Sequence, residues 1–179
     1  MKFLSAITLS IYALDQATKW WIYHHVALIQ SELNVAKFPK VIEKTAHLPE
    51  SFHVIPDWFD IVHWANTGAA FSIGTNNNSL FIFLSVAAFI GIVIAFRRGV
   101  FSDGASRWGA ALLLGGILGN VTDRLVHGYV VDFLLFDLHV PIAHPWPAFN
   151  VADSAITIGA ALLIIDSFRH RPPRVPASK

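Results

Sequence analysis

The sequence contains no cysteine. This absence excludes disulfide bonds, thiolate metal ligands and a cysteine nucleophile. Charged residues are also scarce, at 14% of the chain, and neither sign dominates because the formal net charge is +1. Lys and Arg are scattered rather than clustered, so the sequence gives no support to nucleic-acid binding.

Apolar residues, in contrast, are abundant. They make up 54% of the 179 residues, and the mean hydropathy is +0.52. This composition is typical of an integral membrane protein rather than of a soluble domain. We therefore expect residues 1–179 to form a single membrane domain that is mainly α-helical.

Four long apolar segments predict four transmembrane helices, at residues 3–24, 79–96, 107–127 and 151–169. The second has no charged residue, and at about 1.5 Å per residue it is long enough to cross most of a hydrocarbon core of about 30 Å. The third is rich in Gly and Ala, which permits close helix contact. The first has a competing interpretation as a signal peptide, because Lys2 precedes it, but no convincing small-residue cleavage site follows.

Two polar segments, residues 25–78 and 128–150, are predicted to be outer loops. Within the first, residues 51–73 are rich in Phe, Ile, Val and Trp with partial alternation, which predicts short strands. We expect a small extracytoplasmic β-rich subdomain on the outer face. Residues 28–50 are interpreted as a flexible insertion.

The basic residues predict the orientation. Residues 128–150 contain no Lys or Arg, whereas the N-terminus, the loop between the second and third helices and the tail at 170–179 do. Since cytoplasmic segments carry an excess of basic residues, both termini are expected to be cytoplasmic. The residues on that side are Lys2, Arg97, Arg98, Arg107, Arg169, Arg171, Arg174 and Lys179.

Three aspartates are predicted to reach one membrane depth. Asp123 follows Arg107 by as many residues as Asp153 precedes Arg169, so two antiparallel helices bring both carboxylates to the same level. That level is about 24 Å from the cytoplasmic arginines at about 1.5 Å per residue. Asp15 reaches a similar depth, so the carboxylates are expected near the outer face.

Asp153 has two candidate carboxylate partners. Asp123 precedes Arg124, which can neutralise it and favours a structural role. Asp132 lies in an apolar run that a turn at Gly128 can fold back, and desolvation there should raise its pKa.

Asp153 itself is expected in the first turn of the fourth helix, behind an Asn150 cap, where the helix dipole favours the ionised form. One neutral and one ionised carboxyl group is the arrangement that an aspartic protease requires.

Several simpler interpretations stay open. Each aspartate alone is compatible with a cap or an interface anchor. Asn66 is compatible with a turn and Asn120 with an interhelical hydrogen bond. The sequence has no HExxH or comparable set of ligands, so no metal is expected, and no GxSxG motif, so a serine nucleophile is not expected either.

Five motifs, taken together and in order, resemble the lipoprotein signal peptidase family, also called signal peptidase II, which are bacterial intramembrane aspartic proteases. They are residues 15–19 (DQATK), 66–72 (NTGAAFS), 115–124 (GGILGNVTDR), 128–133 (GYVVDF) and 149–154 (FNVADS). The resemblance covers nearly the whole chain, although the segment 28–50 is longer than is usual in the family.

The resemblance implies that Asp132 and Asp153 form the catalytic dyad. It further implies an enzyme without a cofactor that cleaves prolipoproteins just before a diacylglyceryl-modified cysteine in the bacterial inner membrane, in contact with membrane lipids. Inhibition by globomycin-type cyclic peptides follows from the same likeness, and a monomer is expected. Residues expected to support the site or contact substrate are Asp15, Asn66, Asn120, Asp123, Arg124 and Asn150.

Two other classes also place carboxylates in membranes. A proton-coupled transporter would more often hold them near the midplane, on broken helices and with internal repeats, none of which is evident. A structural subunit would need no dyad, so it would tolerate Asp132→Asn.

Overall fold

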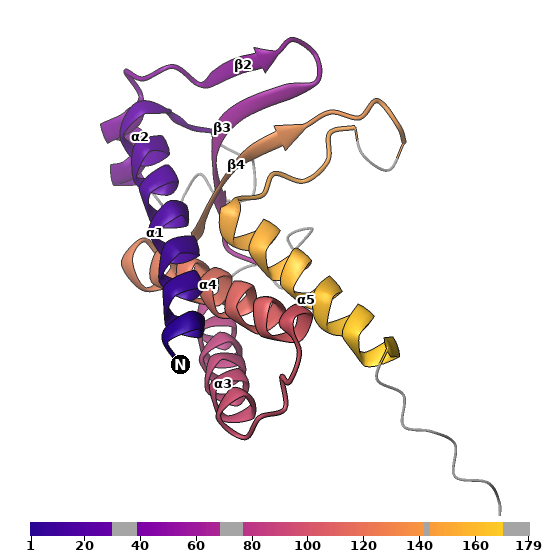
Figure 1. Ribbon diagram of the computed structural model, residues 1–179. Helices are drawn as coiled ribbons and strands as arrows, with labels where there is room; N and C mark the ends of the chain where they lie inside the picture. The colour runs from indigo at the N-terminus through magenta and orange to yellow at the C-terminus, as the bar shows by residue number, and fades with distance from the viewer. Residues whose placement is uncertain (30–38, 69–76, 142–143, 170–179) are drawn as a thin grey trace, which may run out of the picture.

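The computed structural model describes residues 1–29, 39–68, 77–141 and 144–169. Long helices form one part of the molecule and a small sheet caps one end of them (Figure 1). The helices are α1 (Lys2–His25), α2 (Pro39–Thr45), α3 (Asn78–Arg97), α4 (Gly104–Val126) and α5 (Val151–Arg169). The strands are β1 (Leu28–Ile29), β2 (Ser51–Ile55), β3 (Phe59–Asn66) and β4 (Val130–Phe136).

Strand β3 is the centre of the sheet. It pairs antiparallel with β4 along one edge, and along the other edge it pairs antiparallel with β2 and parallel with β1. Apolar side chains from α1, β1, β3 and β4 form the core beneath the sheet: Ile22, Val26, Leu28, Ala65, Tyr129, Val131 and Phe133. Burial in this region lowers the pKa of His63 to about 4, so its imidazole is neutral at pH 7.

Helix α4 is central among the long helices and packs against α1, α3 and α5. Glycines let α4 pack closely against α5, because a Cβ atom added to Gly109 would lie 2.9 Å from the carbonyl oxygen of Gly159 on α5. Such close approach of backbones is common where helices meet inside membranes. Helix α3 lies on the outside of this group, and none of its residues is buried.

Among the described residues, three helices are long and apolar enough to cross a membrane: α3, α4 and α5 up to Phe168. The prediction named four spans. Helix α1 has 24 residues, which is long enough, but its second half carries Asp15, Gln16 and Lys19 and it does not meet the same standard of apolarity.

The predicted helix bounds are close to the observed ones, with small corrections. Helix α4 begins at Gly104 rather than at 107, because the Asp103 side chain accepts a hydrogen bond of 3.0 Å from the Ser106 amide. It ends at Val126, just before Gly128 with its φ of +81°. The segment interpreted as a flexible insertion contains β1 and α2, while its residues 30–38 lie outside the described part.

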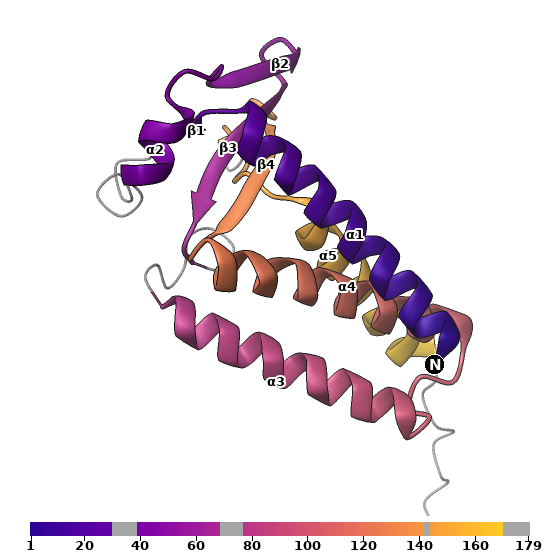
Figure 2. The ribbon, with the colours of Figure 1, turned by 90° about the vertical axis from the view of Figure 1, so that its left-hand side faces the viewer.

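The start of α1, the α3–α4 connection and the end of α5 all lie away from the sheet (Figure 2). The basic residues that were used to predict orientation occur at these three places, apart from those of the tail at 170–179, which the structure does not describe. The sheet and the predicted cytoplasmic side are therefore at opposite ends of the helices.

Candidate active site

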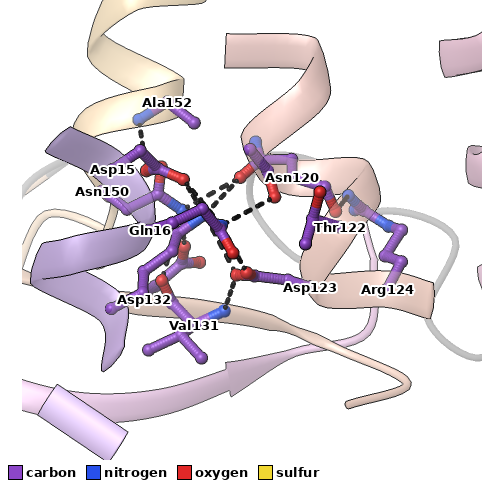
Figure 3. A network of polar contacts seen from close by, with 12 residues as sticks. Asp15, Gln16, Asn120, Thr122, Asp123, Arg124, Val131, Asp132, Asn150 and Ala152 are labelled. Carbon is purple, nitrogen blue, oxygen red and sulfur yellow. Dashed lines mark hydrogen bonds and ion pairs between the residues drawn. The ribbon is translucent and has the colours of Figure 1, made fainter. Parts of the chain in front are cut away.

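Four aspartates, one from each of α1, α4, β4 and α5, belong to one network of hydrogen bonds. Figure 3 labels three of them, Asp15, Asp123 and Asp132. Asp15 is fully buried, and its Oδ1 atom accepts a hydrogen bond of 2.8 Å from the backbone amide of Ala152, at the start of α5. Asp123 and Asp132 are also buried. The expectation that spacing along the helices would gather Asp15, Asp123 and Asp153 at one level therefore agrees with the geometry.

A buried lysine connects two of these carboxylates. The Lys19 Nζ atom lies 2.9 Å from Asp15 Oδ2 and 3.0 Å from Asp123 Oδ2, and it donates a third bond of 2.9 Å to Asn120 Oδ1. Gln16 adds a hydrogen bond of 3.0 Å to Asp123 Oδ1. We call Asp15, Lys19 and Asp123 the charge-compensated cluster, because one ammonium group faces both carboxylates.

The partner predicted for Asp123 was wrong. Its cation is Lys19 rather than Arg124, whose Nη2 atom instead donates a hydrogen bond of 2.7 Å to the carbonyl oxygen of Gly68. Successive residues on a helix point in different directions, so adjacent side chains do not face each other. Asp123 Oδ2 also accepts a 3.0 Å hydrogen bond from the amide of Val131, which ties the start of β4 to α4.

Asp132 is held by amide groups rather than by a cation. Asn66 Nδ2 donates to its Oδ2 atom at 2.9 Å, and Asn150 Nδ2 donates to its Oδ1 atom at 2.7 Å. Burial raises the pKa of Asp132 well above its usual range, and the neighbouring charge of Asp153 raises it further. The hydrogen bond from Asn66, the charge of Lys19 and the hydrogen bond from Asn150 lower this pKa, but they are weaker than the burial. The predicted rise in this pKa agrees with the structure.

Asp153 lies in the first turn of α5, as the sequence predicted. Its amide donates to Asn150 Oδ1 at 2.9 Å, while its own Oδ2 atom accepts from the Asn150 amide at 3.1 Å, so the two residues cap the helix reciprocally. Its Oδ1 atom accepts a 2.8 Å hydrogen bond from Asn120 Nδ2. We call Asp132 and Asp153 the amide-held pair.

Both members of the amide-held pair line a cavity of about 1050 Å³. Asn66, Asn120 and Arg124 also reach it, and the rest of the wall is mainly apolar. It includes Ile117, Leu135, Trp146, Pro147, Phe149 and Ile156. A cavity with few polar groups and a perturbed carboxyl group is the usual form of a site for a mainly apolar ligand.

Each of the eight predicted site residues thus lies at this cavity or in the hydrogen-bond network behind it. Lys19 was not among the predicted site residues, although the spacing of four between Asp15 and Lys19 inside an apolar helix was a usable signal. Of the motif 66–72, residues 69–72 lie outside the described residues. Within the described ranges, no three His, Cys, Asp or Glu side chains are arranged to hold a metal ion.

Comparison with known proteins gives a consistent result. The family model of signal peptidase (SPase) II matches residues 7–169. A lipoprotein signal peptidase of Solibacter usitatus (strain Ellin6076) is 40% identical over 164 residues, which cover 89% of this chain and 86% of that protein. One from Alteromonas mediterranea is 46% identical over 130 residues, covering 70% of this chain and 69% of that protein.

The fold also has a solved counterpart. A structure described as a bacterial membrane enzyme, determined by the in meso method at 2.3 Å resolution, superposes with a TM-score of 0.74 at 26% identity. The match covers 100% of this chain and 95% of the other.

Proposed function

Since this chain belongs to the signal peptidase II family of bacterial membrane proteases that process lipoproteins, we propose that it is an aspartic endopeptidase whose catalytic dyad is Asp132 and Asp153. Its substrates are prolipoproteins. The bond cleaved is the one just before the diacylglyceryl-modified cysteine. The observation that carries this proposal is the amide-held pair: two carboxyl groups that form no salt bridge among the described residues, both hydrogen-bonded to Asn150 and both on the wall of a mainly apolar cavity.

The environments of the two groups support different roles. Asp132, with its raised pKa, carries a proton and donates it to the oxygen of the scissile carbonyl. Asp153 is the ionised member and accepts a proton from the attacking water. The resulting gem-diol intermediate collapses when the C–N bond breaks and the leaving amine takes a proton from Asp153. One hydroxyl of the intermediate returns its proton to Asp132, which yields the carboxylic acid and restores both groups.

In this proposal the whole chain is one membrane domain, with four spans and both termini in the cytoplasm. Helix α1 is the fourth span because its polar side chains face α4 and α5 instead of lipid. The site then lies near the outer face of the inner membrane, where the acyl chains of the modified cysteine are embedded. Globomycin-type peptides occupy the same cavity, and the enzyme acts as a monomer.

Arg124, Asn66, Asn120, Asn150, Asp123 and Asp15 support the dyad or the substrate. The guanidinium of Arg124 holds the carbonyl oxygen of Gly68 at the cavity wall, and the asparagines hold the two carboxyl groups. No metal or cofactor takes part in the proposed reaction.

The test is cleavage of a diacylglyceryl-modified prolipoprotein in detergent micelles by Asp132→Asn, Asp153→Asn and Asp123→Asn, at matched amounts of folded protein. The first two variants should lose more than about 10³-fold in kcat, because each removes one half of the proton transfer. Asp123→Asn should keep measurable activity. Normal cleavage by Asp132→Asn would refute the dyad.

A further inference from the structure

Lys19 is buried between α1 and α4 and does not line the cavity. Its ammonium group has three N–H donors, and three acceptors meet them: Asp15 Oδ2, Asp123 Oδ2 and Asn120 Oδ1. Only the first two acceptors are charged. The third bond, to a neutral amide next to the dyad, is the one that needs a separate explanation.

That third bond determines which way the Asn120 amide faces. Because Lys19 can only donate, it selects the oxygen end of the amide. The nitrogen end must then point the other way, where Nδ2 donates to Asp153 Oδ1 at 2.8 Å. A second donor to Asn120 Oδ1, Asn150 Nδ2 at 3.3 Å, is longer and is shared with Asp132 Oδ1 at 2.7 Å.

A reversed Asn120 amide would present its oxygen to the Asp153 carboxylate. Two acceptors would then face each other inside a buried site, which costs free energy and displaces one of them. Asp153 would keep only its bond from the Asn150 amide. The orientation of one catalytic carboxylate therefore depends on a cation that does not touch it.

We propose that Lys19 is a positioning residue of the protease, which acts through Asn120 to orient Asp153 for its proton transfer. This inference rests on the proposed dyad. It goes beyond a structural role because it links Lys19 to the rate of the chemical step. It predicts an effect on kcat without an effect on KM, since no substrate in the cavity contacts Lys19.

The experiment is a double-mutant cycle with Lys19→Met, Asn120→Ala and the double variant, in the prolipoprotein cleavage assay. Methionine retains the length of the side chain and removes its charge. Lys19→Met should lower kcat between about tenfold and about 100-fold, because small displacements of a catalytic group have effects of that size. KM should stay unchanged, and the double variant should be no slower than Asn120→Ala alone.

A matched control separates positioning from general destabilisation. Thr8 is buried on the same helix and donates a 3.1 Å hydrogen bond to the carbonyl oxygen of Ala111 on α4. Thr8→Val weakens the same helix pair far from the dyad, so folded Thr8→Val should keep the kcat of the unmodified enzyme. If Lys19→Met also keeps it, or if the double variant shows fully additive losses, the positioning role is refuted.

Loss of Lys19 leaves two buried carboxylates facing each other, so Lys19→Met is at risk of not folding. In that case the comparison is made between Asp123→Asn and Lys19→Met/Asp123→Asn, and the double variant should again have the lower kcat. Equal kcat values would overturn the inference. Asp153→Asn is assayed in parallel. If Asp153→Asn cleaves the prolipoprotein, the proposed dyad itself is wrong. If Asp153→Asn is inactive and the Lys19 variant keeps the kcat of its reference protein, only the positioning role is refuted.

Discussion

Two pairs of aspartates meet in one hydrogen-bond network in this protein, and they are held in different ways. Asp15 and Asp123 share the ammonium group of Lys19, whereas Asp132 and Asp153 receive hydrogen bonds mainly from asparagine amides. A cation stabilises the charged form of a carboxyl group strongly, and an amide does so weakly. The first pair is therefore suited to holding helices together, and the second to exchanging protons.

The two pairs are also connected. Asp123 accepts a hydrogen bond from the Val131 amide, which precedes Asp132 in β4, and Asp15 accepts one from the Ala152 amide, which precedes Asp153 in α5. Each carboxylate of the charge-compensated cluster thus fixes the backbone next to one member of the amide-held pair. The cluster provides the rigid support that a reactive pair requires.

The largest expected effect on stability comes from breaking the charge-compensated cluster. Asp15→Asn places an amide between two donors, Lys19 and the Ala152 amide, and leaves part of the Lys19 charge uncompensated. Removing one partner of a buried ion pair in this way should lower the free energy of unfolding by about 3 kcal/mol. The measurement is thermal unfolding in detergent at pH 7.

The matched variant in the other pair is Asp132→Asn. It removes a buried carboxyl group that forms no salt bridge among the described residues, so the lost hydrogen bonds are offset by a smaller desolvation penalty. Its unfolding free energy should change by no more than about 1 kcal/mol. If Asp132→Asn were as destabilising as Asp15→Asn, the distinction between the two pairs would fail.

Much of this arrangement could be predicted from the sequence. Apolar runs and basic residues located the long helices. The turn at Gly128 and the run of apolar residues after it predicted the return of β4, and equal spacing from the arginines predicted that Asp123 and Asp153 reach one level. These are features of one segment at a time. They depend on periodicity and length, which a single sequence carries.

Partners across segments were harder to predict. Arg124 was expected to pair with its neighbour Asp123, but Lys19, far away in the chain, takes that place. Sequence proximity gives little information on which side chains face each other, because that depends on how α1 is rotated against α4. The orientation of the Asn120 amide could not be predicted from the sequence either, since it follows from the hydrogen bond between Lys19 on α1 and Asn120 on α4.

A smaller effect is expected from the glycine that lets α1 approach α4. A Cβ atom at Gly119 would clash with Asp15 Oδ2 and would lie 3.1 Å from the Cβ atom of Ala152. Gly119→Ala should therefore displace Asp15 from Lys19 and lower the free energy of unfolding by about 2 kcal/mol. Gly91→Ala is the control, because nothing lies within 4 Å of a Cβ atom there. Equal stability of the two variants would show that the cluster does not need this close approach.

The smallest expected effect is a shift in pH dependence, and it distinguishes the two members of the amide-held pair. The hydrogen bond from Asn66 lowers the pKa of Asp132, so Asn66→Ala should raise that pKa further. If Asp132 is the proton donor, activity is lost at alkaline pH as Asp132 ionises, and a higher pKa moves the alkaline limb of kcat/KM to higher pH.

The measurement is kcat/KM against pH for the unmodified enzyme, Asn66→Ala and Thr67→Val. Thr67 is the adjacent buried residue, and its hydroxyl has no hydrogen-bond partner among the described residues, so its loss should leave both limbs in place. An upward shift of the acid limb instead would mean that Asp132 must ionise before cleavage, which would exchange the roles of the two aspartates. Because the two groups titrate as a coupled pair, the limbs report the dyad, and only the direction of the shift assigns the roles.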